Sequence, residues 1–467
     1  MASHARTRTA HPTLVLGVVL LSVFAFALLQ SLISPVLPVL RTELDTTQDL
    51  IAWVMTAFLL SASISTPLLG RLGDRYGKDR VLVASLVALA AGAAVSALAP
   101  GIELMIVGRV VQGVGGGVLP LAFGIIRDEL PRERAPGAIG TAAALAAVGG
   151  GVGIVVAGPL TDALGVRSLF WAPAILIAVA AVAARVVVPP SPSRSKGPIS
   201  WLATALMAAW LTALLVPLAQ ASRWGWTSPR VILSLAAAVV LAVAWVVTER
   251  RSDRPLVDMR MMRITAVWTT NLVSLLFGVG LFAVMVFLPG FVQAPPEAGY
   301  GFGASVTRSG LLLLPMTVTM FFAGLASARL ARRFGPRTVL VTASALNATA
   351  VAMLALQHDR QWQIPLALAL LGIALGTAFS TMANVIVAAV RPDQTGVANG
   401  VTANVRTIGG SLGVAVMSAI VSAHTPVGGG LPTETGYTVG FAVLGVAGVA
   451  ALVAATRVPG RGAATTR

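Results

Sequence analysis

Long apolar runs without a single charged residue divide this sequence. Leu14–Ser34 and Ile232–Thr248 are two of them. A helix needs about 20 mostly apolar residues to cross a bilayer, and this chain is 56% hydrophobic with a mean hydropathy of +0.86. A transmembrane β-barrel would instead alternate apolar and polar residues over segments of about ten, a pattern that the sequence lacks. The sequence therefore predicts an all-α integral membrane protein.

Fourteen membrane spans are expected. They are placed at residues 14–38, 50–70, 81–99, 103–126, 136–161, 168–188, 200–220, 231–248, 265–293, 309–328, 338–356, 363–390, 396–423 and 437–456. An even number of spans puts both termini on one side, and twenty-five of the 33 basic residues fall in the loops and tails of that side, against six on the other. Because cytoplasmic loops carry the excess of lysine and arginine, both termini are predicted to be cytoplasmic.

The charge and the residue types argue against several classes of function. A net charge of +16 would suggest nucleic acid as the partner of a soluble chain, but these basic residues lie in short loops beside spans, so no nucleic-acid partner is expected. The chain has no cysteine, and its four histidines form no ligand cluster, so neither a metal nor a cofactor is expected. No His, Cys, Asp or Glu lies deep in a span, which argues against an intramembrane enzyme.

A charged segment occurs twice. GRLGDRYGKDRVL at residues 70–82 has its counterpart in ARLARRFGPRTVL at residues 328–340. The matching residues keep one constant offset, except that Arg332 stands where the first copy has Asp74. The glycines of residues 149–153 and 409–413 form a second, weaker match. The repeat predicts two parallel six-span halves with two spans inserted between them, an architecture of transporters whose substrate site lies between the halves.

These motifs resemble those of the major facilitator superfamily, specifically its fourteen-span drug:proton antiporter branch. Gly70–Lys78 is similar to the superfamily's signature between spans two and three, and Gly158-Pro159 to the core of its antiporter signature in span five. The span-four signature is matched by Leu104, Arg109, Gln112, Gly113 and Gly115. Arg223–Pro229 and Glu249–Asp258 resemble stretches of the fourteen-span branch.

The resemblance implies the major facilitator fold, with two six-helix bundles plus two inserted central helices. The expected parts are a cytoplasmic tail (1–13), an N-terminal bundle (14–188), a linker with the two extra helices and the loop after them (189–264), a C-terminal bundle (265–457) and a cytoplasmic tail (458–467). The stretch 189–199 is rich in proline and serine and is predicted to be a flexible linker.

The resemblance also implies a conformational latch in the loop 71–80. Its residues, called the latch residues below, are Gly70, Asp74, Arg75, Gly77 and Arg80. A helix N-terminus carries about half a positive charge and attracts an acid. Asp74 is therefore expected near Thr395 and Gly396, at the start of span thirteen, when the cytoplasmic side is closed. A solvated loop acid is the alternative.

Span five is expected to form a hinge and a leak barrier. Its small or helix-bending residues are Gly149, Gly153, Gly158 and Pro159, of a kind that permits close packing and bending. Ordinary small-residue packing is the alternative. Two departures from the family pattern weaken the match: Gly153 is one residue off the usual spacing, and Asp162-Ala163 replaces a glycine pair.

The resemblance implies that Arg109 and Gln112 belong to the residues that couple transport to proton movement. The two side chains share one face of span four. A charge inside a span costs at least about 2.5 kcal/mol unless it is paired or hydrated, so a structurally satisfied arginine is the alternative. Relatives in this branch often carry an aspartate inside span one, where this chain has Leu29 followed by Gln30. The remaining candidates for a proton carrier are Asp128 and Asp162, at the ends of spans four and five.

The expected function is export of an antibiotic or another amphipathic small molecule by alternating access, driven by proton antiport. A metabolite exporter, or a facilitator without proton coupling, is the alternative. Because no acid is embedded in a span, neutral, anionic or weakly basic substrates are expected rather than dications. Polar lining of the cavity is expected from Gln30, Asn271, Asn384 and Arg406. For each of them, a hydrogen bond to a neighbouring helix is the equally weighted alternative. The predicted partners are the substrate, protons and lipid, for a monomer in a bacterial cytoplasmic membrane.

Overall fold

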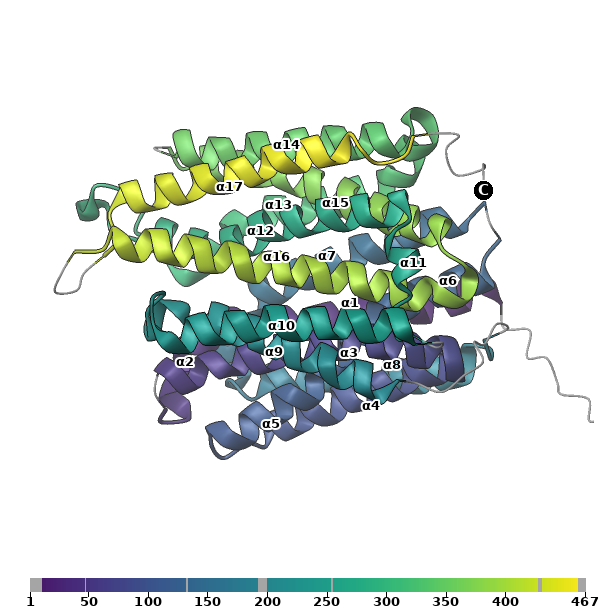
Figure 1. Ribbon diagram of the computed structural model, residues 1–467. Helices are drawn as coiled ribbons and strands as arrows, with labels where there is room; N and C mark the ends of the chain where they lie inside the picture. The colour runs from purple at the N-terminus through teal and green to yellow at the C-terminus, as the bar shows by residue number, and fades with distance from the viewer. Residues whose placement is uncertain are drawn as a thin grey trace, which may run out of the picture.

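The computed structural model describes residues 11–46, 48–131, 133–191, 200–252, 255–358, 360–426 and 431–460. Long helices run side by side along the whole molecule (Figure 1). The predicted tails at residues 1–10 and 461–467, and the linker residues 192–199, lie outside the described residues.

Fourteen helices of the described chain are long and apolar enough to cross a membrane, as predicted. They are α1 (Pro12–Leu32), α3 (Gln48–Tyr76), α4 (Lys78–Ala97), the single span of α5 (Ile102–Gly113) and α6 (Val118–Glu129), α7 (Ala135–Leu164), α8 (Ser168–Val187), α9 (Trp201–Trp224), α10 (Pro229–Arg251), α12 (Thr265–Gln293), α13 (Val306–Phe334), α14 (Pro336–Leu356), α15 (Gln363–Ala389), α16 (Thr395–Ala423) and α17 (Glu434–Ala455). Their number is even, so α1 begins at the same end of the bundle at which α17 ends. A short helix, α11 (Met259–Met262), precedes α12.

Two of the expected spans are interrupted. The first helix ends at Leu32, and a 3₁₀ turn (Ser34–Val36) and α2 (Leu37–Glu43) follow it, because proline provides no N–H for a helical hydrogen bond. The fourth span consists of α5 (Ile102–Gly113), a 3₁₀ turn (Val114–Gly117) and α6 (Val118–Glu129). Glycines of this turn pack directly against α3 and α4, so the irregular backbone is buried in protein rather than exposed to lipid.

The segment predicted as a loop at residues 71–80 is helical, which corrects that expectation. Helix α3 continues to Tyr76 and α4 begins at Lys78, with Gly77 alone between them at φ 108°. Gly335 separates α13 from α14 in the same way, at φ 88°. Only glycine adopts this backbone region without strain, and the two sharp corners show that the repeat is structural.

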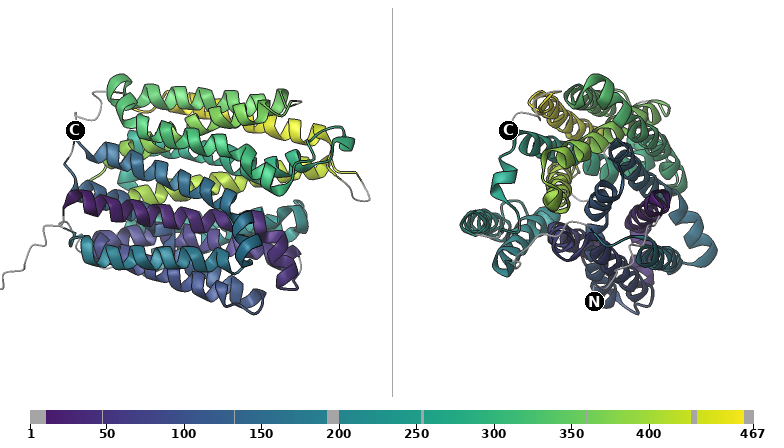
Figure 2. Two further views of the ribbon diagram at one scale, coloured as in Figure 1. Left: turned by 180° about the vertical axis from the view of Figure 1, so that it is seen from behind. Right: turned by 90° about the vertical axis from the view of Figure 1, so that its right-hand side faces the viewer.

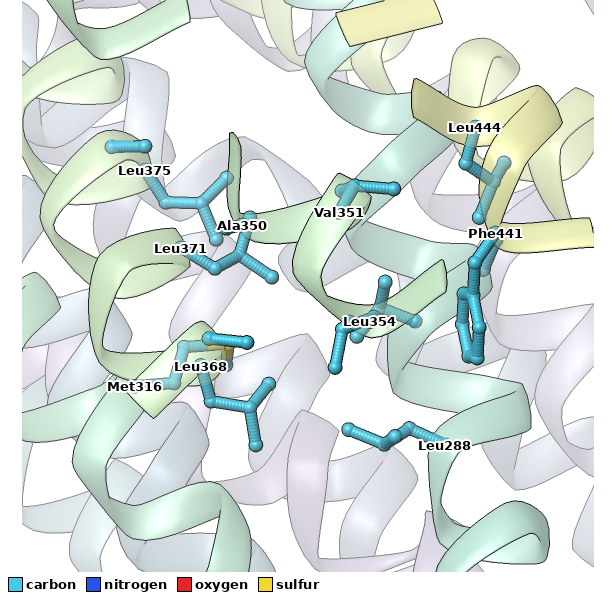
Figure 3. Close-up of a cluster of buried hydrophobic side chains, with 14 of the residues drawn as sticks. Leu288, Met316, Ala350, Val351, Leu354, Leu368, Leu371, Leu375, Phe441 and Leu444 are labelled. Carbon is cyan, nitrogen blue, oxygen red and sulfur yellow. The ribbon is translucent and has the colours of Figure 1, made fainter. Parts of the chain in front are cut away.

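Each half has its own apolar core. In the C-terminal half, α12 to α15 and α17 contribute the buried side chains shown in Figure 3, among them Leu288, Leu354, Leu371 and Phe441. A second cluster in the N-terminal half joins α1, α3, α4, α6, α7 and α8. This second cluster also includes Ala383 and Val387 of α15, so it reaches across the seam between the halves.

The inserted pair α9–α10 lies on one flank of the bundle, as the end-on view shows (Figure 2, right). Helix α9 packs against both α3 and α16, and its buried side chains join a cluster with Val397 and Ala398 of α16. The end of α10 is fastened by Glu249, whose buried carboxylate accepts hydrogen bonds from the N–H groups of Leu256 (2.8 Å) and Val257 (3.2 Å). The inserted pair thus covers the seam between α3 and α16.

Candidate transport cavity and latch

Helices α3 and α16 are in backbone contact near the end of the bundle that carries Asp74, called the Asp74 end below. A Cβ built at Gly70 would lie 2.6 Å from the carbonyl carbon and oxygen of Gly396. A Cβ at Gly400, one turn further along α16, would lie 3.0 Å from the Thr66 carbonyl oxygen. Residues from opposite halves therefore touch without side chains between them, and the two halves are closed against each other at this end.

Asp74 lies at the start of α16, where the resemblance places it. Its side chain is fully buried, and one carboxylate oxygen is 3.4 Å from the position of a Cβ at Gly396. The Val397 amide faces the carboxylate, although neither oxygen has a hydrogen bond of ordinary length. The acid is thus held against the first turn of α16, where the free N–H groups of the helix favour negative charge.

Lys78 lies between two acids. Its ammonium is 2.6 Å from Asp128 Oδ2 and 3.9 Å from Asp74 Oδ1, and Lys78 itself is fully buried. Its stem passes over Gly124 of α6, where a Cβ would lie 2.6 Å from Lys78 Cδ. The three side chains form one buried charge cluster that joins α3, α4 and α6.

Arg127 joins the two halves, although as a basic residue at a span end it was expected only to set the membrane topology. From the end of α6 it donates hydrogen bonds to the Val390 carbonyl oxygen (3.1 Å) and to Thr395 Oγ1. These acceptors lie at the end of α15 and the start of α16. In the sequence, the adjacent acid Asp128 was the feature that could have pointed to a role for Arg127 beyond topology.

The remaining latch residues have simpler surroundings. The Arg75 guanidinium lies over the Tyr76 ring at 4.8 Å, and Arg80 is exposed. Gly77 forms the corner between α3 and α4. Arg332, the counterpart of Asp74 in the repeat, is exposed at the end of α13. The docking of an acid on a helix start therefore belongs to the first copy alone.

A second seam joins α7 to α13. A Cβ at Gly151 would lie 2.1 Å from Thr317, and one at Gly324 would lie 2.8 Å from the Ala144 Cβ. Gly149 and Gly153, predicted as hinge residues, pack instead on α1, close to the Phe24 carbonyl oxygen and Ser31.

The other two predicted hinge residues make no close contact. No neighbouring atom lies within 4 Å of a Cβ at Gly158, and Pro159 is exposed. Helix α7 is continuous through both. The close approach in span five is thus made by its first two predicted glycines and by Gly151.

Arg109 is fully buried and satisfied by neutral acceptors. Its Nε donates to the Val54 carbonyl oxygen (2.9 Å) and its Nη1 to Gln112 Oε1 (2.6 Å), while its guanidinium lies 4.4 Å from the Phe58 ring centre. Gln112 in turn donates to Gly92 O and Ser96 Oγ. The network links α3, α4 and α5, and Phe58 separates it from the cavity described next.

A cavity of about 280 Å³ lies between the halves. Helices α1, α3, α6 and α7 line it from one half and α12, α13, α15 and α16 from the other. Its aromatic lining consists of Phe26, Phe58, Phe123, Phe282 and Phe379, and its polar lining of Gln30, Ser63, Thr66, Asn399, Thr402, Asn404, Arg406 and Thr407. A mostly apolar cavity with a few polar groups suits a small amphipathic molecule.

Two of the four predicted cavity residues, Gln30 and Arg406, line this cavity, and the other two lie elsewhere. Asn271 accepts a hydrogen bond from Thr402 Oγ1 (2.7 Å) and so joins α12 to α16. Asn384 donates to the Pro136 carbonyl oxygen (3.2 Å) at the start of α7. Both amides therefore make helix–helix contacts, and neither is among the residues that line the cavity. Asp162 is exposed at the far end of α7.

The sequence matches the model of the Major Facilitator Superfamily over residues 19–414. Among curated proteins, it is 28% identical over 391 residues to the multidrug resistance protein B homolog of Mycobacterium tuberculosis, covering 81% of this chain and 71% of that one. It is 27% identical over 418 residues to the tetracenomycin C resistance and export protein of Streptomyces glaucescens, covering 88% and 76%. Another relative, an uncharacterised transporter of M. tuberculosis, is 29% identical over 84% of this chain, which spans only 57% of that relative's length.

Solved structures share the fold at low sequence identity. The human organic anion transporter MFSD10 superposes with a TM-score of 0.71 at 16% identity, over 95% of this chain and 99% of the other. The proton:xylose symporter XylE does so with a TM-score of 0.66 at 15% identity, over 96% of each chain. With fourteen apolar helices in two related halves, and a family model that matches most of its length, this multi-pass membrane protein belongs to the Major Facilitator Superfamily.

Proposed function

We propose that this chain is a secondary active transporter that exports an antibiotic or another amphipathic small molecule by alternating access. The observation that carries the proposal is the cavity between the halves, together with the closed seam at its Asp74 end. Rocking of one half against the other would break the contacts of Gly70 and Arg127 and open the cavity to that side. The multidrug-resistance and antibiotic-export names of two relatives support export rather than uptake.

The proposed setting is a bacterial cytoplasmic membrane, with a monomer whose termini and Asp74 end face the cytoplasm. The basic loops at that end support this orientation. The substrate, protons and the bilayer are the proposed partners, and the proton gradient supplies the energy without a cofactor.

The proposed proton carrier is Asp128. Of the two acids expected from the sequence, Asp162 is exposed at the far end of α7, whereas Asp128 pairs with the buried Lys78 beside the moving seam. Opening the seam would change the surroundings of this pair, which is how a conformational change can be coupled to a proton. Asp128→Asn also removes the close partner of the buried Lys78 and so lowers stability, but the folded variant is expected to retain substrate counterflow and to lose the response of transport to a pH gradient.

A facilitator without proton coupling is the second candidate. The observation that favours it is that the described residues lining the cavity include no carboxylate, so substrate and proton do not compete for one acidic group there.

Transport in inside-out vesicles tests both proposals. Vesicles with an acidic interior are given a panel of amphipathic drugs, and uptake is compared with and without a protonophore. Proton-driven export predicts accumulation that collapses with the gradient. Uptake that ignores the gradient would support the facilitator, and absence of uptake for every compound would contradict export.

A further inference from the structure

The described lining of the cavity carries one positive charge and no negative one. Among its described lining residues, Arg406 of α16 is the only charged side chain. No carboxylate of the described chain lies within 4.0 Å of its guanidinium. The ion pairs of the described residues all involve cations other than Arg406. The guanidinium rests on the Phe379 ring, 4.5 Å from the ring centre. A cation inside a membrane protein is costly unless it is paired or hydrated, so this arginine gains from an anion that enters the cavity.

The second arginine of the spans, Arg109, shows what a cation with a full set of acceptors looks like in this protein. Arg109 is enclosed by the Val54 carbonyl and the Gln112 side chain and is separated from the cavity by Phe58. Arg406 has no such acceptors among the hydrogen bonds of the described residues, and it faces the cavity. The two arginines therefore differ in role, although both are embedded in spans.

The aromatic lining strengthens the same preference. Phenylalanine faces attract cations in general, but two of the five rings already carry a guanidinium, Arg109 on Phe58 and Arg406 on Phe379. A cation on one face draws electron density from the ring, so the opposite face attracts a second cation less strongly. Such rings still stack well with the flat apolar part of an aromatic ligand.

We propose that Arg406 selects the substrate class: the cavity binds a planar aromatic molecule that bears one acidic group, a carboxylate or a phenolate, paired with the Arg406 guanidinium. The proposal rests on the proposed transport function and narrows it from amphipathic compounds in general to aromatic anions. A planar guanidinium can hold a carboxylate through two parallel hydrogen bonds, while the rings hold the apolar body. A cationic ligand of the same shape meets a like charge.

Three probes with one ring system test this preference. They are 2-naphthoate (anionic), 2-naphthamide (neutral) and 2-naphthylmethylammonium (cationic), and their dissociation constants are measured by equilibrium dialysis against the full chain in lipid nanodiscs. The wild type is expected to bind naphthoate at least about tenfold more tightly than naphthamide, which corresponds to about 1.4 kcal/mol, and the ammonium most weakly. Equal affinity for naphthoate and naphthamide would overturn the proposal before any variant is made.

Variants assign the preference to one side chain. Arg406→Gln is expected to remove the preference for naphthoate while leaving naphthamide binding within about twofold, which also shows that the variant is folded. Arg406→Lys is expected to retain part of the preference for naphthoate, because the positive charge remains but the planar guanidinium with its paired N–H donors is lost. Arg360→Gln, which removes an exposed arginine outside the cavity, serves as the matched control and is expected to behave as the wild type. An undiminished preference in Arg406→Gln would refute the assignment.

Failure of this proposal is distinguishable from failure of the transport function. If drugs accumulate in vesicles but naphthoate has no advantage in binding, only the proposed substrate class is wrong. If naphthoate binds preferentially through Arg406 but no compound of the vesicle panel is transported, the binding site stands and the export function is wrong.

Discussion

Replacing Gly70 by alanine tests whether the backbone contact between α3 and α16 keeps the Asp74 end closed. A Cβ there lies 2.6 Å from the carbonyl of Gly396 and 2.9 Å from Val397 N, whereas ordinary contact begins at 3.4 Å. One helix must therefore withdraw by about 0.8 Å, since backbone cannot rotate away as a side chain can. Overpacking costs about 1–3 kcal/mol. The ratio of closed to open molecules is expected to fall about 5- to 150-fold.

Double electron–electron resonance measures this ratio directly. The chain has no cysteine, so spin labels at Tyr76→Cys on α3 and Arg333→Cys on α13 are the only ones, and both positions are exposed. Gly70→Ala is expected to increase the population at the longer distance. Gly150→Ala is the matched control, because no atom lies within 4 Å of a Cβ at Gly150. The reasoning is refuted if Gly70→Ala matches the wild type or if Gly150→Ala shifts the distribution equally.

The other predictions concern the charges at the Asp74 end. Asp74→Asn is expected to reduce export by up to about 30-fold, since a buried acid at a helix start contributes up to about 2 kcal/mol. Arg332→Gln, at the equivalent exposed position, is expected to reduce export less than twofold. Equal losses in vesicle uptake would leave Asp74 without a latch role. Lys78→Met leaves the Asp128 carboxylate unpaired in a buried cluster and is expected to cost about 3–5 kcal/mol of stability, seen as a lower Tm in detergent. Arg80→Met, at an exposed cation two residues away, is expected to change stability by no more than about 0.5 kcal/mol, and a similar Tm for both variants would mean that the cluster contributes little.

The sequence predicted best those features that have a single physical cause. The cost of exposing backbone to lipid requires long apolar helices, so all fourteen spans were predictable. The exceptions are local. The segment 71–80 was assigned to a loop because it is charged, yet α3 runs to Tyr76, since a helix end that packs on protein can carry charge at no great cost.

The cavity was predictable only in part, because sequence alone does not say which way each helix faces. Spans that are apolar on every side have little amphipathic pattern to orient them. Asn271 and Asn384 were therefore expected to line the cavity with Gln30 and Arg406, although they bond to neighbouring helices. The contact of Arg127 with α16 was missed for a related reason: a basic residue at a span end is also what topology requires.

The position of α9 makes the two seams of this fold unequal towards lipid. A lipophilic compound dissolved in a leaflet could approach the cavity sideways, either between α3 and α16 or between α7 and α13. The first route is covered by α9, whose buried side chains Met207 and Leu211 share a cluster with Val397 of α16. The inserted pair therefore shields one of the two seams from lipid, whereas the α7–α13 seam is closed by the close contacts of its own two helices.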